Sequence, residues 1–157
     1  MEINMQPVAW VHNTRQGLKD DFWGDVVSDI TLADYIPDEA FDGIETFSHL
    51  EILFYFDKVA PGNIVFSGHP RGNPEWPNTG IFAQRKKDRP NRIGLSTVEL
   101  LAHDGRTITV RRLDAVDGTP ILDIKPVYRE FRPQREIRQP EWVAELMKDY
   151  WKQTPLD

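Results

Sequence analysis

Residues 95–113 read LSTVELLAHDGRTITVRRL, and this stretch decides the fold class. Two runs with alternating apolar and polar residues, 95–102 and 107–113, flank the sequence HDGR. An Asp-Gly pair between two such runs is a strong signal for a β-hairpin, because glycine readily adopts the positive φ that a tight turn needs. The stretch therefore predicts two adjacent antiparallel strands.

Short strand signals continue on both sides of this hairpin. Residues 50–56, LEILFYF, are almost entirely apolar and predict a strand that is buried on both faces. Shorter apolar stretches predict further strands at 8–11, 26–32, 80–83 and 120–127. Many short strands with few helices favour a mainly β fold, either an antiparallel barrel or a sandwich.

The clearest helix signal lies at residues 140–152. Pro140 suits the first helical position, and Glu141 suits the positive end of the helix dipole. Large apolar side chains recur three to four residues apart and form one stripe: Trp142, Val143, Leu146, Met147, Tyr150 and Trp151. This stripe packs either on the protein's own sheet or on another subunit. A much shorter helical turn is expected at 37–41.

The length of 157 residues predicts a single domain over 1–157, with a barrel in about residues 6–128 and the helix at 140–152. No apolar run is long enough to cross a bilayer, and the N-terminus lacks the features of a secretory signal. We therefore expect a cytoplasmic protein without a membrane partner. Cysteine is absent, which excludes disulfides, thiolate metal sites and cysteine nucleophiles.

The net charge of −6 is unevenly distributed. It is −9 over residues 1–84, +5 over 85–138 and −2 over 139–157. A basic middle segment in an acidic chain indicates one cationic surface for an anionic partner. Alternatively, these charges scatter around the fold and only solvate it.

Several common kinds of site are not encoded. The glycine-rich phosphate loops and the strand–helix alternation of nucleotide-binding Rossmann folds are missing. The G-x-S-x-G elbow of hydrolases is missing as well. The four histidines lack the spacing of a metal site, so we expect no metal: His12, His49, His69 and His103.

The densest group of chemically active side chains lies at 80–96, GIFAQRKKDRPNRIGLS. Five cations follow an apolar run, while Pro90 fixes the backbone and Gly94 permits an unusual turn. A basic loop held between two strands is a natural site for a carboxylate or a phosphate. The alternative is a solvated basic turn.

A second group lies at 113–126, LDAVDGTPILDIKP, with three carboxylates within ten positions. The sequence DGTP is also an ordinary turn signature, which by itself explains Asp117. Asp123 and Lys125 alternate with Leu122 and Ile124, so they share one face of a strand. There they either form an ion pair or line a site.

Together these segments resemble the TsaA-like, or YaeB-like, family of S-adenosylmethionine-dependent methyltransferases. The family pattern reads approximately F-S-H-L, then G-[IV]-F-A-T-R, R-P-N-P-I-G-[LM]-S and D-x-x-D-G-T-P-[VI]-x-D-I-K-P-Y. This chain has FSHL at 47–50, GIFAQR at 80–85, RPNRIGLS at 89–96 and DAVDGTPILDIKP at 114–126, in the same order. Typical members methylate the exocyclic nitrogen of threonylcarbamoyl-adenosine beside the anticodon of threonine tRNA. The resemblance covers about residues 44–128.

This resemblance implies a small antiparallel β-barrel of short strands with a C-terminal α-helix, and a homodimer. It also implies S-adenosyl-L-methionine as a cofactor held among loops, and tRNA as the substrate. Carried over by motif position, the cofactor-binding residues are Asp57, Lys58, Arg85, Leu95, Asp114, Val116, Asp117 and Gly118. The family often places a P-R-Q loop against the cofactor, and residues 21–24, DFWG, lie near that position.

The chemistry of such a methyl donor suggests individual roles. Arg85 would bind its carboxylate, and Asp114 or Asp117 its ammonium or ribose hydroxyls. Aromatic side chains would form apolar walls around it: Phe22, Trp23, Phe56 and Phe82. Candidate catalytic residues are Asp123, as acceptor of the amine proton, and Asn91. The acceptor and its phosphates would contact Arg89, Asn91, Arg92 and Lys125.

Three positions depart from the family pattern. Arg92 replaces a proline, Gln84 replaces a threonine, and Val127 displaces the usual tyrosine to position 128. Longer bacterial members continue into a C-terminal region that is thought to help hold tRNA. Two other functions stay open: a non-catalytic S-adenosylmethionine-binding module, and a methyltransferase that acts on a small molecule or a protein.

Overall fold

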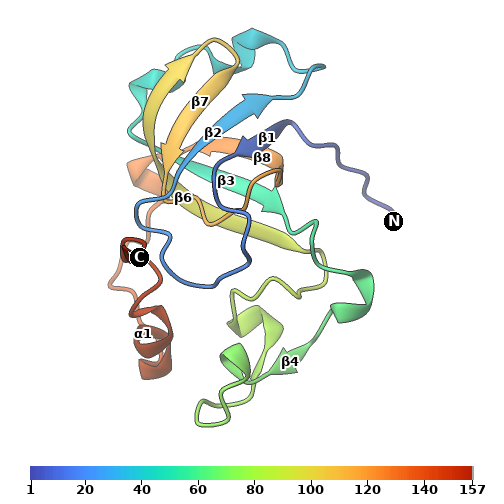
Figure 1. The fold of residues 1–157 in the computed structure, drawn as a ribbon, viewed down its shortest axis with the longest axis vertical. Coiled ribbons are helices and arrows are strands. Elements are labelled where there is room, and N and C mark those ends of the chain that lie inside the picture. The colour runs from blue at the N-terminus through green and yellow to red at the C-terminus, as the bar shows by residue number, and fades with distance from the viewer. Residues whose placement is uncertain (157) are drawn as a thin grey trace.

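The computed structural model describes residues 1–156, and its centre is a closed six-stranded antiparallel barrel in the order β1-β2-β7-β6-β3-β8 (Figure 1). The barrel strands are β1 (Ala9–His12), β2 (Val27–Leu32), β3 (His49–Tyr55), β6 (Ile93–Asp104), β7 (Thr107–Arg111) and β8 (Pro120–Pro126). The predicted mainly β class, with a small barrel and a C-terminal helix, is confirmed.

Apolar side chains fill the barrel, as expected for so few strands. Every second residue of β3 is buried, namely Leu50, Ile52 and Phe54, and these meet Val98 and Ile121 from the neighbouring strands. The prediction that residues 50–56 are buried on both faces is wrong, because the alternate side chains of β3 are only partly buried. Strand β3 lies between two strands of a barrel, and the outer face of a barrel strand remains open unless another element covers it.

The predicted hairpin is confirmed by the pairing of Asp104 with Thr107 across a turn in which Gly105 has φ 56. Strand β6 is longer than expected, because its first half pairs with β3 and its second half pairs with β7. The register of the pairing with β7 shifts between Leu100 and Ala102. At its start, Gly94 faces Phe54, and a Cβ at this glycine would lie 2.4 Å from the Phe54 ring. The glycine thus leaves room for Phe54, the largest fully buried side chain of the core.

Residues 56–92 form a long excursion below the barrel in Figure 1. It contains the two-stranded sheet of β4 (Ser67–Gly68) and β5 (Thr79–Gly80) and three short 3-10 turns: Pro61–Asn63, Pro70–Gly72 and Ile81–Ala83. The strand predicted at 80–83 is therefore wrong beyond Gly80. The chain turns there because Ile81 is buried, and the Gln84 side chain donates to the carbonyls of Gly68 and Thr79 at 2.9 and 3.0 Å.

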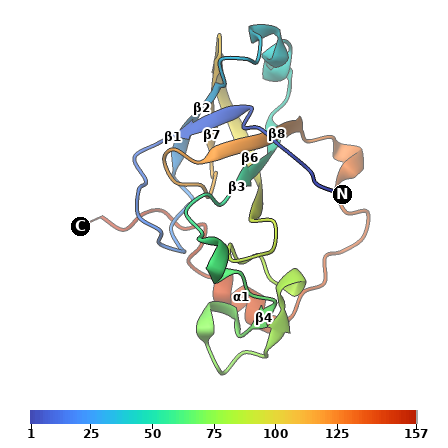
Figure 2. The same cartoon turned by 90° about the vertical axis from the view of Figure 1, so that its right-hand side faces the viewer.

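The remaining 3-10 turns are Asp38–Phe41, Ile44–Thr46 and Arg129–Phe131, and the first of these is the short turn predicted at 37–41. Helix α1 (Glu141–Met147) is the predicted C-terminal helix, but it ends five residues earlier than expected. Figure 2 shows the chain leaving the end of β8, running down one side of the molecule and reaching α1 beside the β4–β5 excursion. There the Trp76 and Trp142 rings lie 6.3 Å apart, and Trp76 donates to Glu145 at 2.9 Å. Trp142 of the apolar stripe thus packs on the excursion, whereas Trp151 of the same stripe lies beside Arg112, the residue after β7.

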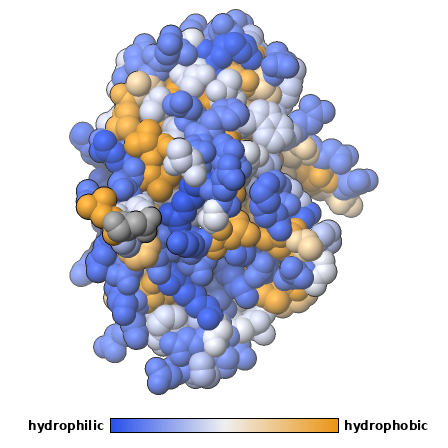
Figure 3. All heavy atoms as spheres, viewed as in Figure 1, coloured by the Kyte–Doolittle hydropathy of each residue, from blue (hydrophilic) through white to orange (hydrophobic). Residues whose placement is uncertain are grey.

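The face seen in Figure 3 is mostly hydrophilic, with hydrophobic side chains in separate small patches. No helix within residues 1–156 has both the length and the apolar character needed to cross a bilayer.

Candidate cofactor site beside strand β6

The basic loop (residues 85–92) and the aspartate turn (residues 114–118) bind to two consecutive residues of β6. Arg85 donates a hydrogen bond to the carbonyl oxygen of Leu95. The next residue, Ser96, is buried and donates from its hydroxyl to Asp114. Arg85 and Asp114 are 29 positions apart in the sequence, yet they bind Leu95 and Ser96, which are consecutive residues of one strand.

A loop near the N-terminus holds the aspartate turn from the other side. The backbone N–H of Asn13 donates to the Asp117 carboxylate at 3.1 Å, and the Asn13 side chain donates to the carbonyl of Ala115 at 2.9 Å. In return, the N–H of Asp117 donates to the carbonyl of Arg15 at 2.8 Å. Within the turn, Gly118 has φ 78, and its N–H donates to the carbonyl of Val11. The turn is therefore anchored to β1 and to the loop that follows β1.

Arg15 organises the rest of this N-terminal loop. Its guanidinium donates to the carbonyls of Phe22 and Asp21 at 2.8 and 2.6 Å and lies 3.8 Å from the centre of the Trp23 ring. Trp23 is buried, and Phe22 has the unusual φ of 68. A bulky residue at positive φ is costly, so the surrounding hydrogen bonds must hold it in place.

Residues 149–152, near the C-terminus, pack on this loop. The N–H groups of Phe22, Trp23 and Gly24 donate to the carbonyls of Asp149, Tyr150 and Lys152 at 3.2, 2.8 and 3.2 Å. This places the Tyr150 hydroxyl on Asp114, to which it donates a hydrogen bond. Asp114 therefore accepts from both Ser96 and Tyr150, so strand β6 and the C-terminal segment bind the same carboxylate.

The pKa of the Tyr150 hydroxyl lies far above its ordinary value. Burial is the main cause, because it penalises the phenolate, and the neighbouring Asp114 carboxylate adds to it by repulsion and by accepting the proton in a hydrogen bond. Arg85 acts in the opposite direction and lowers this pKa, which places its charge near the same hydroxyl. The Tyr150 hydroxyl thus keeps its proton and donates a hydrogen bond to Asp114 throughout the neutral range.

We expect Tyr150 to make stability fall at alkaline pH. Below pH 10.0 the hydroxyl is protonated in both the folded and the unfolded chain; above it the unfolded chain loses the proton first, which favours unfolding. The free energy of unfolding should fall by up to about 1.4 kcal/mol per pH unit from this group. Urea titrations between pH 8 and 11 should show a shallower alkaline decline for Tyr150→Phe than for the wild type. Identical slopes would show that the hydroxyl is not held as described.

Arg89 and Arg92, two predicted substrate-binding residues, form hydrogen bonds within and beside the basic loop. Arg92 has φ 52, donates to the carbonyl of Val59 at 2.7 Å and lies 4.7 Å from the centre of the Tyr55 ring. Arg89 donates back to the carbonyl of Gln84 at 3.0 Å. Both guanidinium groups thus bind backbone carbonyls and help to shape the loop.

The turn after β3 lies against this loop. The N–H of Phe56 donates to the carbonyl of Arg92 at 2.8 Å, and the Phe56 ring contacts Phe54 edge to face at 5.2 Å. Asp57 and Lys58 form an ion pair with each other at 3.2 Å on the surface. The structure thus brings 56–58 to the basic loop, but shows no direct contact between them and Asp114.

The candidate catalytic residues do not meet Arg85 and Asp114. Asp123 is paired with Lys125 at 2.7 Å and also accepts from the N–H of Ile124 at 3.0 Å, so both of its oxygens are engaged locally. Their shared strand face is therefore the site of an ion pair, and Asp123 raises the pKa of Lys125. Asn91 is exposed in the basic loop. Of the proposed apolar walls, Phe82 is 82% exposed. Val116, which the motif places at the cofactor, is buried.

Four residues of this network were not among the sequence predictions: Arg15, Asn13, Ser96 and Tyr150. A signal existed for the first, because Thr14-Arg15-Gln16 differs from the P-R-Q loop in one position only. The loop that reaches the aspartate turn is thus 13–16, whereas 21–24 packs around Arg15 and on the C-terminal segment. Ser96 lay within a recognised motif, and Tyr150 lay in the apolar stripe.

Two surface hollows lie away from this network. One of about 670 Å³ and one of about 560 Å³ both include His49 and Tyr128, and neither is lined by Arg85 or Asp114. Within residues 1–156, no group of three or more His, Asp or Glu side chains is arranged to hold a metal ion.

The barrel and the motifs on it define a family. The chain belongs to the family of the tRNA-methyltransferase O N-terminal domain, whose model matches residues 15–132. The family membership predicted from the motifs is thereby confirmed.

Individual relatives agree with this assignment. A probable S-adenosyl-L-methionine-binding protein of Methanothermobacter thermautotrophicus is 37% identical over 133 residues, which are 83% of this chain and 93% of that protein. The tRNA (adenine(37)-N6)-methyltransferase of Escherichia coli is 41% identical over 99 residues, 60% of this chain and 42% of that enzyme. The crystal structure of TrmO from Pseudomonas aeruginosa shares the fold, with a TM-score of 0.69 at 24% identity over 88% of this chain and 62% of that one. The chain thus spans less than two thirds of the length of several of the curated relatives it matches.

Proposed function

We propose that this chain is an S-adenosyl-L-methionine-dependent methyltransferase that methylates N6 of a threonylcarbamoyl-adenosine in tRNA. We further propose that the cofactor binds between the basic loop and the aspartate turn. The observation that carries the proposal is the junction at β6, where Arg85 binds Leu95 and Asp114 binds Ser96. One cation and one carboxylate are thus held in fixed positions close together.

The polar groups at this junction fit the amino-acid end and the ribose of the cofactor. A guanidinium has five N–H donors, and Arg85 uses one in its bond to Leu95, which leaves donors for a carboxylate. A carboxylate accepts about four hydrogen bonds, and Asp114 accepts two, from Ser96 and Tyr150. The remaining capacity suits an ammonium group or ribose hydroxyls. The exposed ring of Phe82, three residues before Arg85, offers an apolar face.

The bound cofactor would supply an activated methyl group on a sulfonium. The chain's own residues then have the task of alignment: Arg85 and Asp114 hold the donor, and the strand that connects them fixes the spacing. Because Asp123 is engaged with Lys125, we propose that it acts as a proton acceptor only if this exposed ion pair opens on substrate binding.

The names of the relatives support this proposal, since they include S-adenosyl-L-methionine-binding proteins and tRNA (adenine(37)-N6)-methyltransferases. A second candidate is a non-catalytic S-adenosylmethionine-binding module. It is favoured by one observation: the predicted proton acceptor Asp123 has no oxygen without a donor.

Two measurements separate these functions. Titration calorimetry with S-adenosylmethionine should show binding, and the labelled methyl group should then be transferred to tRNA from cells that lack the modification. Binding without transfer to tRNA would support the module, and no binding at saturating cofactor would refute both proposals. Transfer only to small molecules or proteins would refute the tRNA substrate.

We also propose that the chain forms a homodimer and works in the cytoplasm, where tRNA is modified. Phe66 and Phe82 in the excursion are 73% and 82% exposed, and a second copy is one way to cover such side chains. Light scattering at several concentrations, with Phe66→Ser as a comparison, tests the dimer.

A further inference from the structure

The segment after β8 carries a regular series of arginines that no part of the proposed site uses. Within residues 128–138, YREFRPQREIR, an arginine occurs at every third position: Arg129, Arg132, Arg135 and Arg138. With two glutamates, this segment has a net charge of +2 in a chain of net charge −6. The family model ends at 132, so the last two arginines lie beyond it.

These four cations are open to a partner. All of residues 128–140 are exposed, and the segment runs down one side of the molecule (Figure 2). Within the part of the chain that the structure describes, none of the four guanidinium groups forms an ion pair. By contrast, the partly exposed Arg106 and the exposed Arg111 are each paired with an acidic side chain.

Aromatic rings stand at the start of the same segment. Tyr128 stacks on Phe47 with 5.8 Å between ring centres, and Phe131 contacts Tyr128 edge to face at 6.0 Å. Tyr128 is 49% exposed and Phe131 is 84% exposed. Unpaired nucleic-acid bases stack on such rings and on guanidinium planes.

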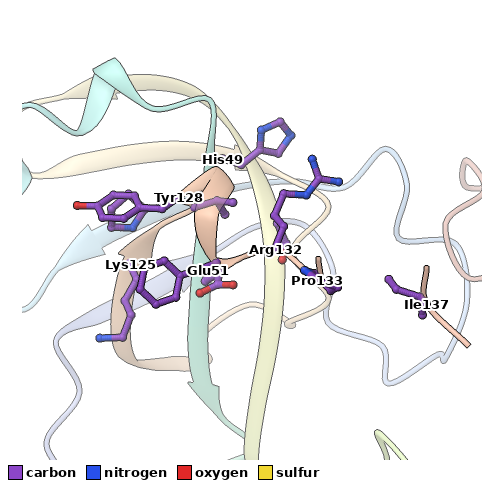
Figure 4. A pocket seen from close by; sticks show the side chains of 11 residues that line it. His49, Glu51, Lys125, Tyr128, Arg132, Pro133 and Ile137 are labelled. Atoms are coloured by element: carbon purple, nitrogen blue, oxygen red, sulfur yellow. The ribbon is translucent and has the colours of Figure 1, made fainter. Parts of the chain in front are cut away.

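Tyr128, Phe131 and Arg132 border the larger hollow, of about 670 Å³ (Figure 4), whereas Phe47 lines the smaller one. The floor of the larger hollow is the outer face of β6, β3 and β8, where Glu51 pairs with both Thr97 and Lys125. The neighbouring row on this face contains Leu95, Leu53 and Asp123, because Leu53 pairs with both of the others. The hollow therefore begins about 7 Å along β6 from Leu95, the residue that binds Arg85.

We propose that this surface, made of the rings of Phe47, Tyr128 and Phe131 together with Arg129, Arg132, Arg135 and Arg138, binds the single-stranded RNA that flanks the methylated nucleotide. The proposal rests on the proposed function, since it needs an RNA substrate. Unpaired arginines beside exposed rings complement phosphates and bases, and the surface leads along one sheet face to the candidate cofactor site. The arginines hold the backbone without reading its sequence.

The test compares two double variants of the full chain that remove the same charge. Arg135→Ala/Arg138→Ala removes two cations of the surface, whereas Lys19→Ala/Lys148→Ala removes two exposed cations outside it that form no ion pair within residues 1–156. Binding of unmodified tRNA is measured by filter binding between 50 and 300 mM salt. The arginine variant should bind about tenfold more weakly at 100 mM, and the slope of log affinity against log salt should be shallower by about 2. The lysine variant should match the wild type.

A stacking variant separates rings from charges. Phe131→Ala should weaken tRNA binding severalfold and leave the salt slope unchanged, because a ring releases no counterions. Thermal unfolding and S-adenosylmethionine affinity should stay at wild-type values in all three variants.

If the wild type binds and methylates tRNA but the arginine variant has unchanged tRNA affinity, this surface does not bind the RNA. The proposed function would remain intact. A wild type that binds the cofactor but not tRNA would overturn both. A change of oligomeric state in the arginine variant, seen by light scattering without loss of tRNA affinity, would show an interface between copies instead and would also overturn the proposal.

Discussion

Arg85→Ala is expected to weaken S-adenosylmethionine binding about a hundredfold or more, with almost no change in stability. The Arg85 side chain is exposed and donates a hydrogen bond to the carbonyl of Leu95, so the fold loses little without it. A charged group that pairs with a ligand's carboxylate contributes about 2–5 kcal/mol when it is truncated, and about 2.7 kcal/mol corresponds to a hundredfold change. Titration calorimetry measures the affinity, and urea unfolding measures the stability.

The matched control is Lys87→Ala, which removes a cation two residues away that forms no ion pair within residues 1–156. It should bind the cofactor like the wild type. Arg92→Ala should also keep cofactor binding but lose stability, because its guanidinium binds Val59 and stacks on Tyr55. Equal losses of affinity in Arg85→Ala and Lys87→Ala would mean that general charge, rather than a specific contact, attracts the ligand.

Gly24→Ala is expected to release the C-terminal segment from the site. A Cβ at Gly24 would lie 2.0 Å from the carbonyl oxygen of Trp151 and 2.8 Å from its carbonyl carbon, and both are backbone atoms that cannot rotate away. Residues 149–152 must then shift, so the Tyr150 hydroxyl leaves Asp114. We expect a loss of about 2–3 kcal/mol in the free energy of unfolding, as for other overpacked sites, and weaker cofactor binding.

Gly17→Ala is the control, since a Cβ there meets nothing within 4 Å and the residue lies in the same loop. Hydrogen exchange of the 149–152 amides should increase in Gly24→Ala alone. A Gly24→Ala chain with wild-type stability and unchanged exchange would show that the segment does not pack on this loop.

The barrel could be predicted because its signals are local. The Asp104-Gly105 turn and the apolar run of β3 depend on neighbours in the sequence, and both lie where they were expected. The end of α1 could not be predicted, because it depends on distant hydrogen bonds. The carbonyls of Asp149, Tyr150 and Lys152 accept from residues 22–24, and a continued helix could not offer them in that arrangement.

The candidate site was predictable only in part for the same reason. Arg85 and Asp114 stand in recognisable motifs, and the structure brings their two turns to adjacent residues of β6. Tyr150 reaches Asp114 only through the folded C-terminal segment, and nothing in the stripe at 142–151 distinguishes it from a packing residue.

Substitutions within the motifs also have consequences that the sequence alone does not show. Arg92 stands where the family has a proline, and its φ of 52 is one that the proline ring forbids. This loop therefore has a different backbone conformation from that of members with proline. The Arg92 guanidinium also links the loop to the carbonyl of Val59.

A crystal structure of the chain with S-adenosylmethionine would test the central claim most directly. The account predicts that the ligand lies between the two turns, with its carboxylate on Arg85 and its ammonium or ribose on Asp114 or Asp117. A ligand bound elsewhere, such as in the hollow beside His49 and Tyr128, with no contact to either turn, would contradict it.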